Sequence, residues 1–457
     1  MNKEQQAASG RRDVLKMLGL GSAAFLAGNL GDISNAHAKE IDMIKKAPAG
    51  LAPIKITGVK AITTRGGGGS NLIVVKVETS EPGLYGLGCA TFTQRAEVVV
   101  TAIDRYLAPF CIGRDADNIE DLWRAMYVSS YWRNGPVLNN GISGVDQALW
   151  DIKGKRANMP VYQLLGGKTR FAVDTYTSVS GSTPEVVAEG VAKEIAAGQR
   201  HVRIQIGGYG GVGALGTTPD FKNEGFGKPT DSYMDERAYL KAVPKMFAAV
   251  RKQCGDDVEL CHDIHERCQP LGVINMCKEL EQYRPFFIED PLSPENKHWW
   301  KQMRESTTVP FAMGELFNNV NEFVDPIVNH YFDYIRIHVS QIGGITQAMK
   351  VARLGEWFNV NTAWHGPGDV SPIGHSAQAH MDLALSNFGI QEGGANMPDA
   401  MKEVFPGGNI KKNGYIYVSD APGLGIDINE TAAKKYPISN NAGNWTVRRR
   451  DGSIVTP

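Results

Sequence analysis

Three acidic residues follow short apolar runs at equal intervals, and this spacing constrains the fold more than any other feature of the chain. Asp263, Glu289 and Glu315 are separated by 26 residues each, and each ends such a run. An interval of this length holds about one strand, one helix and two short loops. The spacing therefore predicts consecutive βα units of a parallel barrel, with the three carboxylates at the C-terminal strand ends, where such barrels carry their active sites.

Three carboxylates that converge on one point form a candidate metal site. They are hard, anionic oxygen donors, and no cysteine stands among them, so the set favours Mg²⁺ over zinc. Acidic residues also follow strands as helix N-caps or loop residues, and that interpretation would account for any one of the three alone. Their shared register favours a single site.

The charge balance excludes several classes of partner. The chain has 457 residues, with 48 basic and 49 acidic side chains, so its net charge is close to zero. We expect no nucleic-acid footprint and no polybasic membrane surface. The length is sufficient for two domains with a large core.

The first 38 residues resemble an export signal rather than part of the fold. Arg11 and Arg12 precede an apolar stretch at 17–30 and a small-residue cleavage site at 36–38. This pattern is typical of a twin-arginine signal peptide, and the stretch is too short and glycine-rich to span a bilayer comfortably. An uncleaved membrane anchor or an unstructured leader is the alternative. We predict a periplasmic mature protein that begins near Lys39 with a linker at 39–53 and has no membrane anchor.

The six cysteines give no metal-binding spacing. They contain no CxxC pair, and four of them lie between 254 and 277: Cys254, Cys261, Cys268 and Cys277. An oxidising compartment permits a disulfide within this cluster. The simpler interpretation is that most of the cysteines are small buried hydrophobic residues.

The pattern of strands and helices changes along the chain and predicts its organisation. Residues 54–170 begin with alternating apolar residues at 71–78 and continue with helical periodicity at 96–107, 119–127 and 144–157. This order indicates an α+β domain. Residues 171–398 alternate short strands with helices, which predicts a TIM-type barrel. The long insertion at 207–235 suggests a functional loop, and we expect the segment 399–457 to pack on the N-terminal domain.

Ordered motifs along the mature chain resemble those of the enolase superfamily, and within it those of the mannonate dehydratase subgroup of sugar-acid dehydratases. The motifs are YWRNGP at 131–136, GVDQALWDIKGK at 144–155, HDIHER at 262–267, IEDP at 288–291, GELFN at 314–318, GGIT at 343–346, HGPGD at 365–369, NFGIQE at 387–392 and DAPGLG at 420–425. The resemblance extends from about 56 to 437. It implies an α/β fold: a modified (β/α) TIM-type barrel with an N-terminal α+β capping domain completed by the C-terminal tail.

The resemblance also implies a shared chemistry. One Mg²⁺ would be held by Asp263, Glu289 and Glu315, the substrate carboxylate would bind the metal, and a base would remove the proton α to it. His265 matches the family's general acid, which protonates the departing β-hydroxyl. It stands two positions after Asp263, so we expect both side chains on the same side of the strand. A structural histidine is the alternative.

Other candidate residues follow later strands. His365 and Asp369 resemble substrate-binding positions, although their spacing also suits a hydrogen bond within the loop. Glu392 could bind a substrate hydroxyl or cap the next helix. Arg336, which we predict to bind substrate, and His338 lie two apart and should face the same way. His338 could pair with His365, act as a base, or be a core histidine.

The identity of the base is left open by the sequence. The subgroup pairs an arginine on the second strand with a tyrosine twelve residues later; Arg203 matches, but position 215 is leucine. The nearest phenol is Tyr209, whose pKa the charge of Arg203 could lower; a loop aromatic that shields the site is the alternative. The candidates for the base are therefore Tyr209, Arg203, His338 and His365.

Two substrate-contact positions also differ from the subgroup. Thr93 replaces an asparagine near the capping-domain loop, and Ser178 replaces a histidine at the end of the first barrel strand. We predict a Mg²⁺-dependent lyase that dehydrates a small sugar acid of the mannonate or gluconate type to a 2-keto-3-deoxy acid, acting as a homo-oligomer. An epimerase or cycloisomerase is one alternative. A non-catalytic periplasmic protein that binds or senses sugar acids is the other.

Overall fold

The computed structural model describes residues 52–208, 211, 231–393, 397–439 and 445–455. The predicted signal peptide at 1–38 and nearly all of the linker at 39–53 lie outside these residues, as do Tyr209, Leu215 and most of the insertion at 207–235. The chain from Ile54 to Pro457 forms one compact unit. Within the described ranges, no helix is both long enough and apolar enough to cross a membrane.

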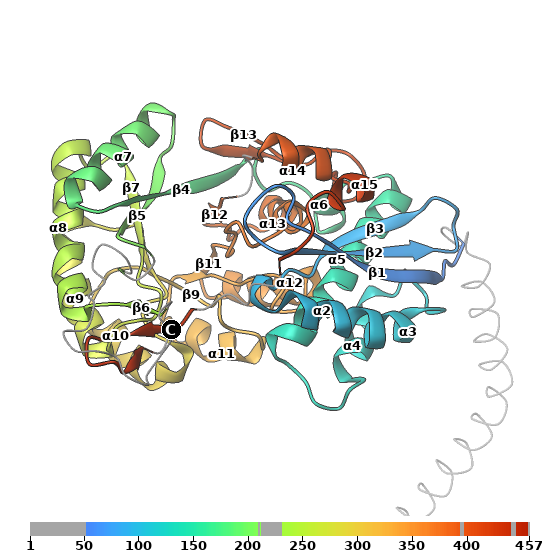
Figure 1. The fold of residues 1–457 in the computed structure, drawn as a ribbon, viewed down its shortest axis with the longest axis horizontal. Helices are drawn as coiled ribbons and strands as arrows, with labels where there is room; N and C mark the ends of the chain where they lie inside the picture. Colours follow the sequence, from blue (N-terminus) through green and yellow to red (C-terminus); the bar gives the residue numbers. More distant parts are fainter. Residues whose placement is uncertain (1–51, 209–210, 212–230, 394–396, 440–444, 456–457) are drawn as a thin grey trace, which may run out of the picture. The chain divides into compact units, whose positions relative to one another are not determined.

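The N-terminal part of this unit is an antiparallel sheet covered by helices. Strands β1 (Ile56–Thr64), β2 (Leu72–Thr79) and β3 (Tyr85–Cys89) lie in the order β1-β2-β3. The helical segments that follow are α2 (Ala96–Ala102), a π-helical turn (Ile103–Leu107), α3 (Ala108–Cys111), α4 (Ile119–Val128) and α5 (Pro136–Ala157). The predicted α+β order is confirmed (Figure 1).

Helix α5 begins eight residues before the predicted helix at 144–157. Pro136 occupies its first turn, where a missing N–H costs nothing, and the polar residues Asn139 and Asn140 conceal the helical periodicity. The helix packs against β3 at very close range. A Cβ atom at Gly86 or Gly88 would lie 2.0 Å from a carbonyl oxygen of α5, so only glycine fits there.

The remainder is a closed parallel barrel. Its strands run in the order β4 (Val173–Gly181), β5 (His201–Ile206), β7 (Glu259–Asp263), β8 (Phe287–Glu289), β9 (Phe311–Met313), β10 (Tyr334–Ile335) and β11 (Asn361–Thr362). A bridge between Thr362 and Phe388 leads to β12 (Gln391–Glu392), which pairs with β4 and completes the ring. The predicted TIM-type barrel is therefore confirmed.

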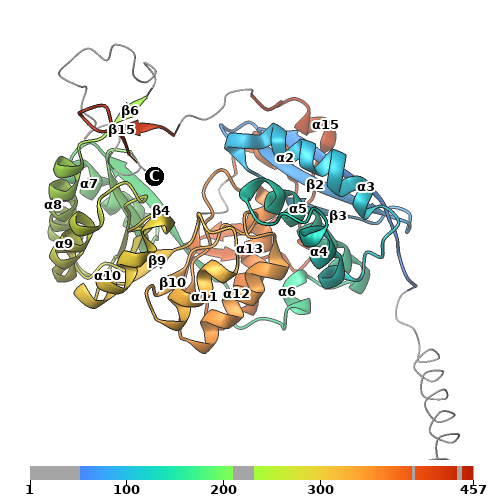
Figure 2. The ribbon, with the colours of Figure 1, turned by 90° about the horizontal axis from the view of Figure 1, so that it is seen from below.

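Helices between successive strands cover the outside of the barrel (Figures 1 and 2). They are α7 (Pro184–Ala196), α8 (Glu236–Cys254), α9 (Pro270–Leu280), α10 (Trp300–Ser306), α11 (Asn321–Val328), α12 (Ile345–Trp357) and α13 (Pro372–Ala384). A short helix, α6 (Val161–Leu164), leads into the barrel. This connectivity brings the C-terminal ends of all the barrel strands to one face.

We expected the segment 399–457 to pack on the N-terminal domain. Its described residues instead contact both the N-terminal domain and the barrel. Helix α14 (Asp399–Val404) precedes β13 (Ile410–Lys412) and β14 (Tyr415–Tyr417), and β14 pairs with barrel strand β4. Helix α15 (Glu430–Ala433) does contact the N-terminal sheet, where Glu430 pairs with Lys60 and Lys76. The last strands form a small separate sheet: β15 (Val447–Arg448) pairs with β16 (Ile454–Val455) on one side and with β6 (Ser232–Tyr233), which precedes α8, on the other (Figure 2).

All six cysteines lie in the described part of the chain, and each is a free thiol. The disulfide that we considered for the cluster at 254–277 does not form. Five of the six are buried and Cys254 is half-buried, so the interpretation as small hydrophobic residues is confirmed.

Candidate active site

The three equally spaced carboxylates, Asp263, Glu289 and Glu315, come from adjacent parallel strands. Asp263 and Glu289 are the last residues of β7 and β8 and stand opposite one another in the register of the two strands. Glu315 follows β9 after a turn at Gly314. The φ of Gly314 is +130°, a value that favours glycine, and a Cβ atom added there would lie 2.5 Å from Phe323. Asp263 and Glu289 are fully buried.

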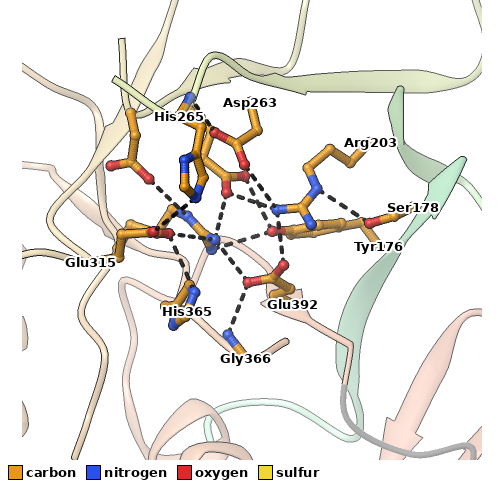
Figure 3. A network of polar contacts seen from close by, with 12 residues as sticks. Tyr176, Ser178, Arg203, Asp263, His265, Glu315, His365, Gly366 and Glu392 are labelled. Carbon is orange, nitrogen blue, oxygen red and sulfur yellow. Dashed lines mark hydrogen bonds and ion pairs between the residues drawn. The ribbon is translucent and has the colours of Figure 1, made fainter. Parts of the chain in front are cut away.

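Two arginines lie among these carboxylates, and Figure 3 shows the resulting network. Arg203, from β5, contacts Glu289 at 2.8 Å and Glu392 at 2.9 Å. Arg336, just after β10, contacts Glu289 at 2.5 Å, Glu392 at 2.8 Å and Glu315 at 3.2 Å. The guanidinium of Arg336 therefore separates Glu315 from Glu289 in this structure.

The arrangement shifts the carboxyl pKa values in opposite directions. Burial raises the pKa of Asp263 to about 6 and that of Glu289 to about 8, against the positive charge of Arg203. Burial would also raise the pKa of Glu315, but the charges of His365 and Arg336 outweigh it and lower this pKa to about 2. The positive charge of the arginines therefore does not offset the burial of Asp263 and Glu289, and both carboxylates would gain from additional positive charge.

A divalent cation would supply that charge. Side-chain oxygens of Asp263, Glu289 and Asp290 lie within 4.8 Å of one another, and all three residues are buried. Nearby, Glu266 Oε1 has no hydrogen-bond partner among the described residues. Buried carboxylate oxygens at this separation are suitable donors for a hard ion such as Mg²⁺. Glu315, which we predicted as the third ligand, is outside this close group because Arg336 lies between.

His265 lies over the carboxylates, although not for the reason that the sequence suggested. Strand β7 ends at Asp263, so strand alternation does not orient His265. Its φ is +57°, and its backbone N–H donates to Asp263 Oδ1 at 2.7 Å. Its Nε2 is 3.9 Å from Glu315 Oε1, and its ring stacks on Trp445 with centroids 5.5 Å apart. Burial lowers the pKa of His265 to about 4.

A second histidine flanks Glu315 from another strand. His365 Nε2 lies 3.4 Å from Glu315 Oε2. The His338 ring is beside that of His365, with centroids 5.0 Å apart, and burial lowers the pKa of His338 to about 3. Asp369 completes this group, because its carboxylate and both imidazoles offer atoms within 4.8 Å of one another. His338 is thus a neutral imidazole next to His365.

One candidate base is wrong. The carboxylates of Glu289 and Glu392 outweigh the effect of burial and raise the pKa of Arg203 well above its usual value. Arg203 therefore stays protonated and cannot accept a proton. Tyr209 lies outside the described residues.

The remaining predicted residues hold defined positions. Glu392 accepts the backbone N–H of Gly366 at 2.9 Å, in addition to its arginine contacts. Ser178 Oγ accepts from Arg203 Nε at 3.2 Å. Thr93 Oγ1 donates to the Asn71 carbonyl at 3.2 Å.

A cavity of about 670 Å³ brings most of these side chains together. Its lining includes Thr93, Arg203, Asp263, His265, Glu315, Arg336, His365, Asp369 and Glu392. Glu289 and His338 do not line this cavity; they lie behind residues that do. A small polar acid would be surrounded by two imidazoles, three guanidiniums and several carboxylates.

Sequence reasoning missed several residues of the site, among them Asp290, next to Glu289 in the chain, and Glu266. Tyr176 donates to Glu289 Oε2 and accepts from Arg336 Nη1, each at 3.3 Å. Its place two residues before Ser178 on β4 could have indicated it. Arg65 and Trp445 also line the cavity, but they come from a glycine-rich loop and from the C-terminal tail, where no spacing marks them.

Comparisons with known proteins agree with this architecture. The model of the mandelate racemase / muconate lactonizing enzyme N-terminal domain matches residues 41–166, and the enolase C-terminal domain-like model matches residues 187–432. The resemblance inferred from the sequence motifs is confirmed.

Individual relatives match over most of the chain. D-galactonate dehydratase family members from Musicola paradisiaca and Pantoea ananatis are 49% and 50% identical, and each alignment covers 89% of this chain and 100% of the relative. The crystal structure of an enolase from Pantoea ananatis with bound D-gluconate and Mg superposes with a TM-score of 0.84 at 49% identity. That match covers 88% of this chain and 100% of the other. The chain therefore belongs to the enolase superfamily and, within it, to the D-galactonate dehydratase family.

Proposed function

We propose that the protein is a Mg²⁺-dependent dehydratase that converts a sugar acid of the mannonate or gluconate type into a 2-keto-3-deoxy acid. The observation that carries the proposal is the convergence of Asp263, Glu315 and the two flanking histidines on one cavity, with Glu289 opposite Asp263 on the neighbouring strand. The similarity to a structure with bound D-gluconate and Mg supports the class of substrate.

Asp263, Glu289 and Glu315 would hold the ion, and Arg336 would then move from its place between Glu289 and Glu315. When bound, Mg²⁺ supplies the positive charge that stabilises an acid anion as its α-proton is removed. Arg203 and Arg336 neutralise Glu289 and Glu392 in the structure. These arginines would also keep the carboxylate side of the cavity receptive to an anionic substrate.

His265 donates a proton to the departing β-hydroxyl. A general acid must be protonated, and burial keeps the unliganded imidazole neutral at neutral pH. The negative charge of a bound substrate favours the imidazolium and raises its pKa toward the working range. Glu315, 3.9 Å from Nε2, acts in the same direction.

Among the described residues, His365 is the best-placed base. It lines the cavity, and its Nε2 lies 3.4 Å from Glu315 Oε2. Its Nδ1 is buried and has no hydrogen-bond partner among the described residues. Tyr209 stays a prediction for the same role.

The two imidazoles also favour a second candidate function. His265 and His365 contact different oxygens of Glu315, and two proton-handling groups on different sides of one substrate carbon are what an epimerase requires. Epimerisation therefore shares the proposed site and the first proton transfer, and differs in where the proton returns.

One experiment separates these functions. The purified protein is incubated with Mg²⁺ and mannonate, gluconate or galactonate in D₂O, and both 2-keto product and deuterium at the α-carbon are measured. A dehydratase gives 2-keto product, an epimerase gives deuterated epimer without it, and a non-catalytic binding protein gives neither. Absence of 2-keto product from every acid would overturn the proposal.

A matched pair of variants tests the role of His265. His265→Asn should abolish the 2-keto product while α-deuterium exchange continues, because the base is intact. His298→Asn, which changes an exposed histidine, should behave as the wild type. Dehydration by His265→Asn at the wild-type rate would contradict the assignment.

We also propose that residues 1–38 direct the enzyme to the periplasm, on the basis of Arg11, Arg12 and the apolar stretch after them. Fractionation of cells that express the full chain tests this. Replacement of both arginines by lysine should retain the protein in the cytoplasm, and an unchanged distribution would contradict export by the twin-arginine route.

A further inference from the structure

A second cavity adjoins the candidate active site. Its volume is about 540 Å³, and it shares Arg65, Arg203 and Glu392 with the first cavity. Ser178, at the C-terminal half of β4, lines only the second cavity. The two cavities therefore meet at the ion pair between Arg203 and Glu392, which Figure 3 shows.

The two cavities have opposite charge. The first is lined by three arginines, Arg65, Arg203 and Arg336, which are outnumbered by its five carboxylates: Asp263, Glu266, Glu315, Asp369 and Glu392. The second is lined by Arg65, Arg203 and Lys411, and Glu392 is its single carboxylate among the described residues. Glu392 is already paired with both Arg203 and Arg336. The second cavity thus carries positive charge that its own lining does not neutralise.

Lys411 is the clearest example of a positive charge in the second cavity that no described neighbour neutralises. It is the central residue of β13, with Ile410 and Lys412 exposed on either side, while Lys411 itself is half-buried in the cavity wall. Within the described ranges, its ammonium group forms no ion pair or hydrogen bond. Burial lowers its pKa, and the distant charge of Glu194 compensates only in part. A partly desolvated ammonium without a partner is costly unless an anion binds to it.

Arg65 and Asn409 add further polar groups that are not in use. Arg65 Nη2 donates to the Gly69 carbonyl at 3.0 Å, but its Nε is buried without a partner. The side-chain oxygen of Asn409 is likewise buried without one. Three polar side chains from two distant segments of the chain therefore line the same cavity and retain hydrogen-bonding capacity.

We propose that the second cavity binds an anionic group at the far end of the substrate, so that the enzyme acts on a dianionic hydroxy acid. The first carboxylate would lie in the acidic cavity with the metal ligands, and Lys411 and Arg65 would bind the second anion. This inference rests on the proposed function, because it assigns the other end of the same substrate. A neutral hydroxymethyl end would leave both cations unpaired.

The distal anion could be a carboxylate or a phosphate, since both accept hydrogen bonds from lysine and arginine. Glucarate has two carboxylates, and 6-phosphogluconate has a carboxylate and a phosphate with nearly two charges. They serve as the two probes with an anionic group at each end, and gluconate is the matched monoanion. We expect kcat/KM for at least one dianion to exceed that for gluconate by about tenfold or more, the gain typical of one charge-assisted contact. Which dianion is preferred distinguishes the two sources.

Variants of β13 test whether the preference for a dianion depends on Lys411. In Lys411→Met, the ratio of kcat/KM for the preferred dianion to that for gluconate should fall about tenfold, because an apolar side chain of similar length replaces the charge. Lys411→Arg should keep the ratio, and Lys412→Met, on the exposed face of the same strand, is the control. A ratio that is the same in Lys411→Met and the wild type would overturn the proposal.

Failure of this inference and failure of the proposed function give different results. Dehydration of gluconate, with no preference for either dianion, overturns only the distal subsite. If no acid yields 2-keto product, the proposed dehydration is overturned, and calorimetric titration of the Mg²⁺-loaded protein decides the subsite. Tighter binding of a dianion than of gluconate, lost in Lys411→Met, would support it, and equal binding would overturn it.

Discussion

Two groups of carboxylates are buried equally deeply in this protein but are stabilised in different ways. Asp151, on α5, accepts from the backbone N–H groups of Leu87 and Leu424 at 3.0 and 2.8 Å and from Lys155 Nζ at 2.7 Å. Asp146, one turn earlier, accepts from Thr346 at the start of α12. These carboxylates join the N-terminal domain to the barrel and to the C-terminal segment.

The carboxylates of the candidate active site instead face one another. Asp263 accepts one backbone N–H, from His265, and its nearest cation, Arg203, is 3.7 Å away. The charges of Glu315 and Glu392 act on it as well. The comparison shows that burial alone does not mark function. Fixed N–H donors make a carboxylate structural, whereas neighbouring carboxylates leave it in need of a cation.

Asp263→Asn should give the largest effect on activity. The loss of one metal ligand removes several kcal/mol of charge stabilisation, so we expect kcat/KM to fall by about 10³-fold. The melting temperature without Mg²⁺ should not fall, because the amide removes a buried carboxyl group that is crowded by other acids. Steady-state kinetics and thermal melts with and without Mg²⁺ measure both. Wild-type kinetics would exclude Asp263 as a ligand.

Asp151→Ala should show the opposite pattern. Two backbone N–H groups and Lys155 lose their acceptor, so we expect the free energy of unfolding to fall by about 3 kcal/mol. Activity per folded molecule should change little, because Asp151 does not line the cavity. Urea denaturation followed by circular dichroism measures the change, with Asp257→Ala, at an exposed position, as the control. An unchanged unfolding midpoint would contradict the structural role.

The pH dependence of stability should separate the two groups as well. The pKa values of Asp263 and Glu289 are raised to about 6 and about 8, so the folded state binds more protons than the unfolded state between pH 4.5 and 8. Stability of the metal-free protein should therefore fall as pH rises through this window, by at most about 1.4 kcal/mol per pH unit for each proton.

Mg²⁺ should reverse this trend, because it competes with protons for the same oxygens. We expect the increase in melting temperature on addition of Mg²⁺ to be small at pH 5 and to grow toward pH 8. Asp146, with a pKa raised to about 7 by burial, should contribute the same slope with and without the ion. An equal Mg²⁺ effect at both pH values would indicate that the site carboxylates are not the ligands.

The same comparison shows which parts of the molecule were predictable. The convergence of Asp263, Glu289 and Glu315 was predictable from their spacing alone, because neighbouring parallel strands place their C-terminal ends together. The position of His265 depends on a left-handed backbone at φ +57°, which strand alternation does not reveal. The ion pairs of Arg336 with Glu289 and Glu315 depend on tertiary packing, as do the cavity positions of Arg65 and Lys411.

Trp445 is the residue furthest from sequence-based prediction, and its substitution should have the smallest effect. The β15–β6 pairing, with Arg448 Nε 2.7 Å from Asp231 Oδ2, fixes the tail beside the barrel. The indole lies nearly parallel to the His265 ring, at 14°. Because this stack limits the motion of His265 and covers it from water, Trp445 is a positioning residue. Aromatic stacking contributes about 1 kcal/mol, so Trp445→Ala should lower kcat about fivefold.

Trp445 could act on His265 or could contribute packing alone, and the dependence of kcat on pH distinguishes these two roles. A loss of packing alone would not change that pH profile. Exposure of His265 to water in Trp445→Ala weakens the desolvation that lowers its pKa, so the limb of the profile that reports His265 should move to higher pH. Trp445→Phe should restore both the rate and the profile, and Trp357→Ala, at an exposed surface position, should change neither. An unshifted profile in Trp445→Ala would mean that the indole lines the cavity without controlling the acid.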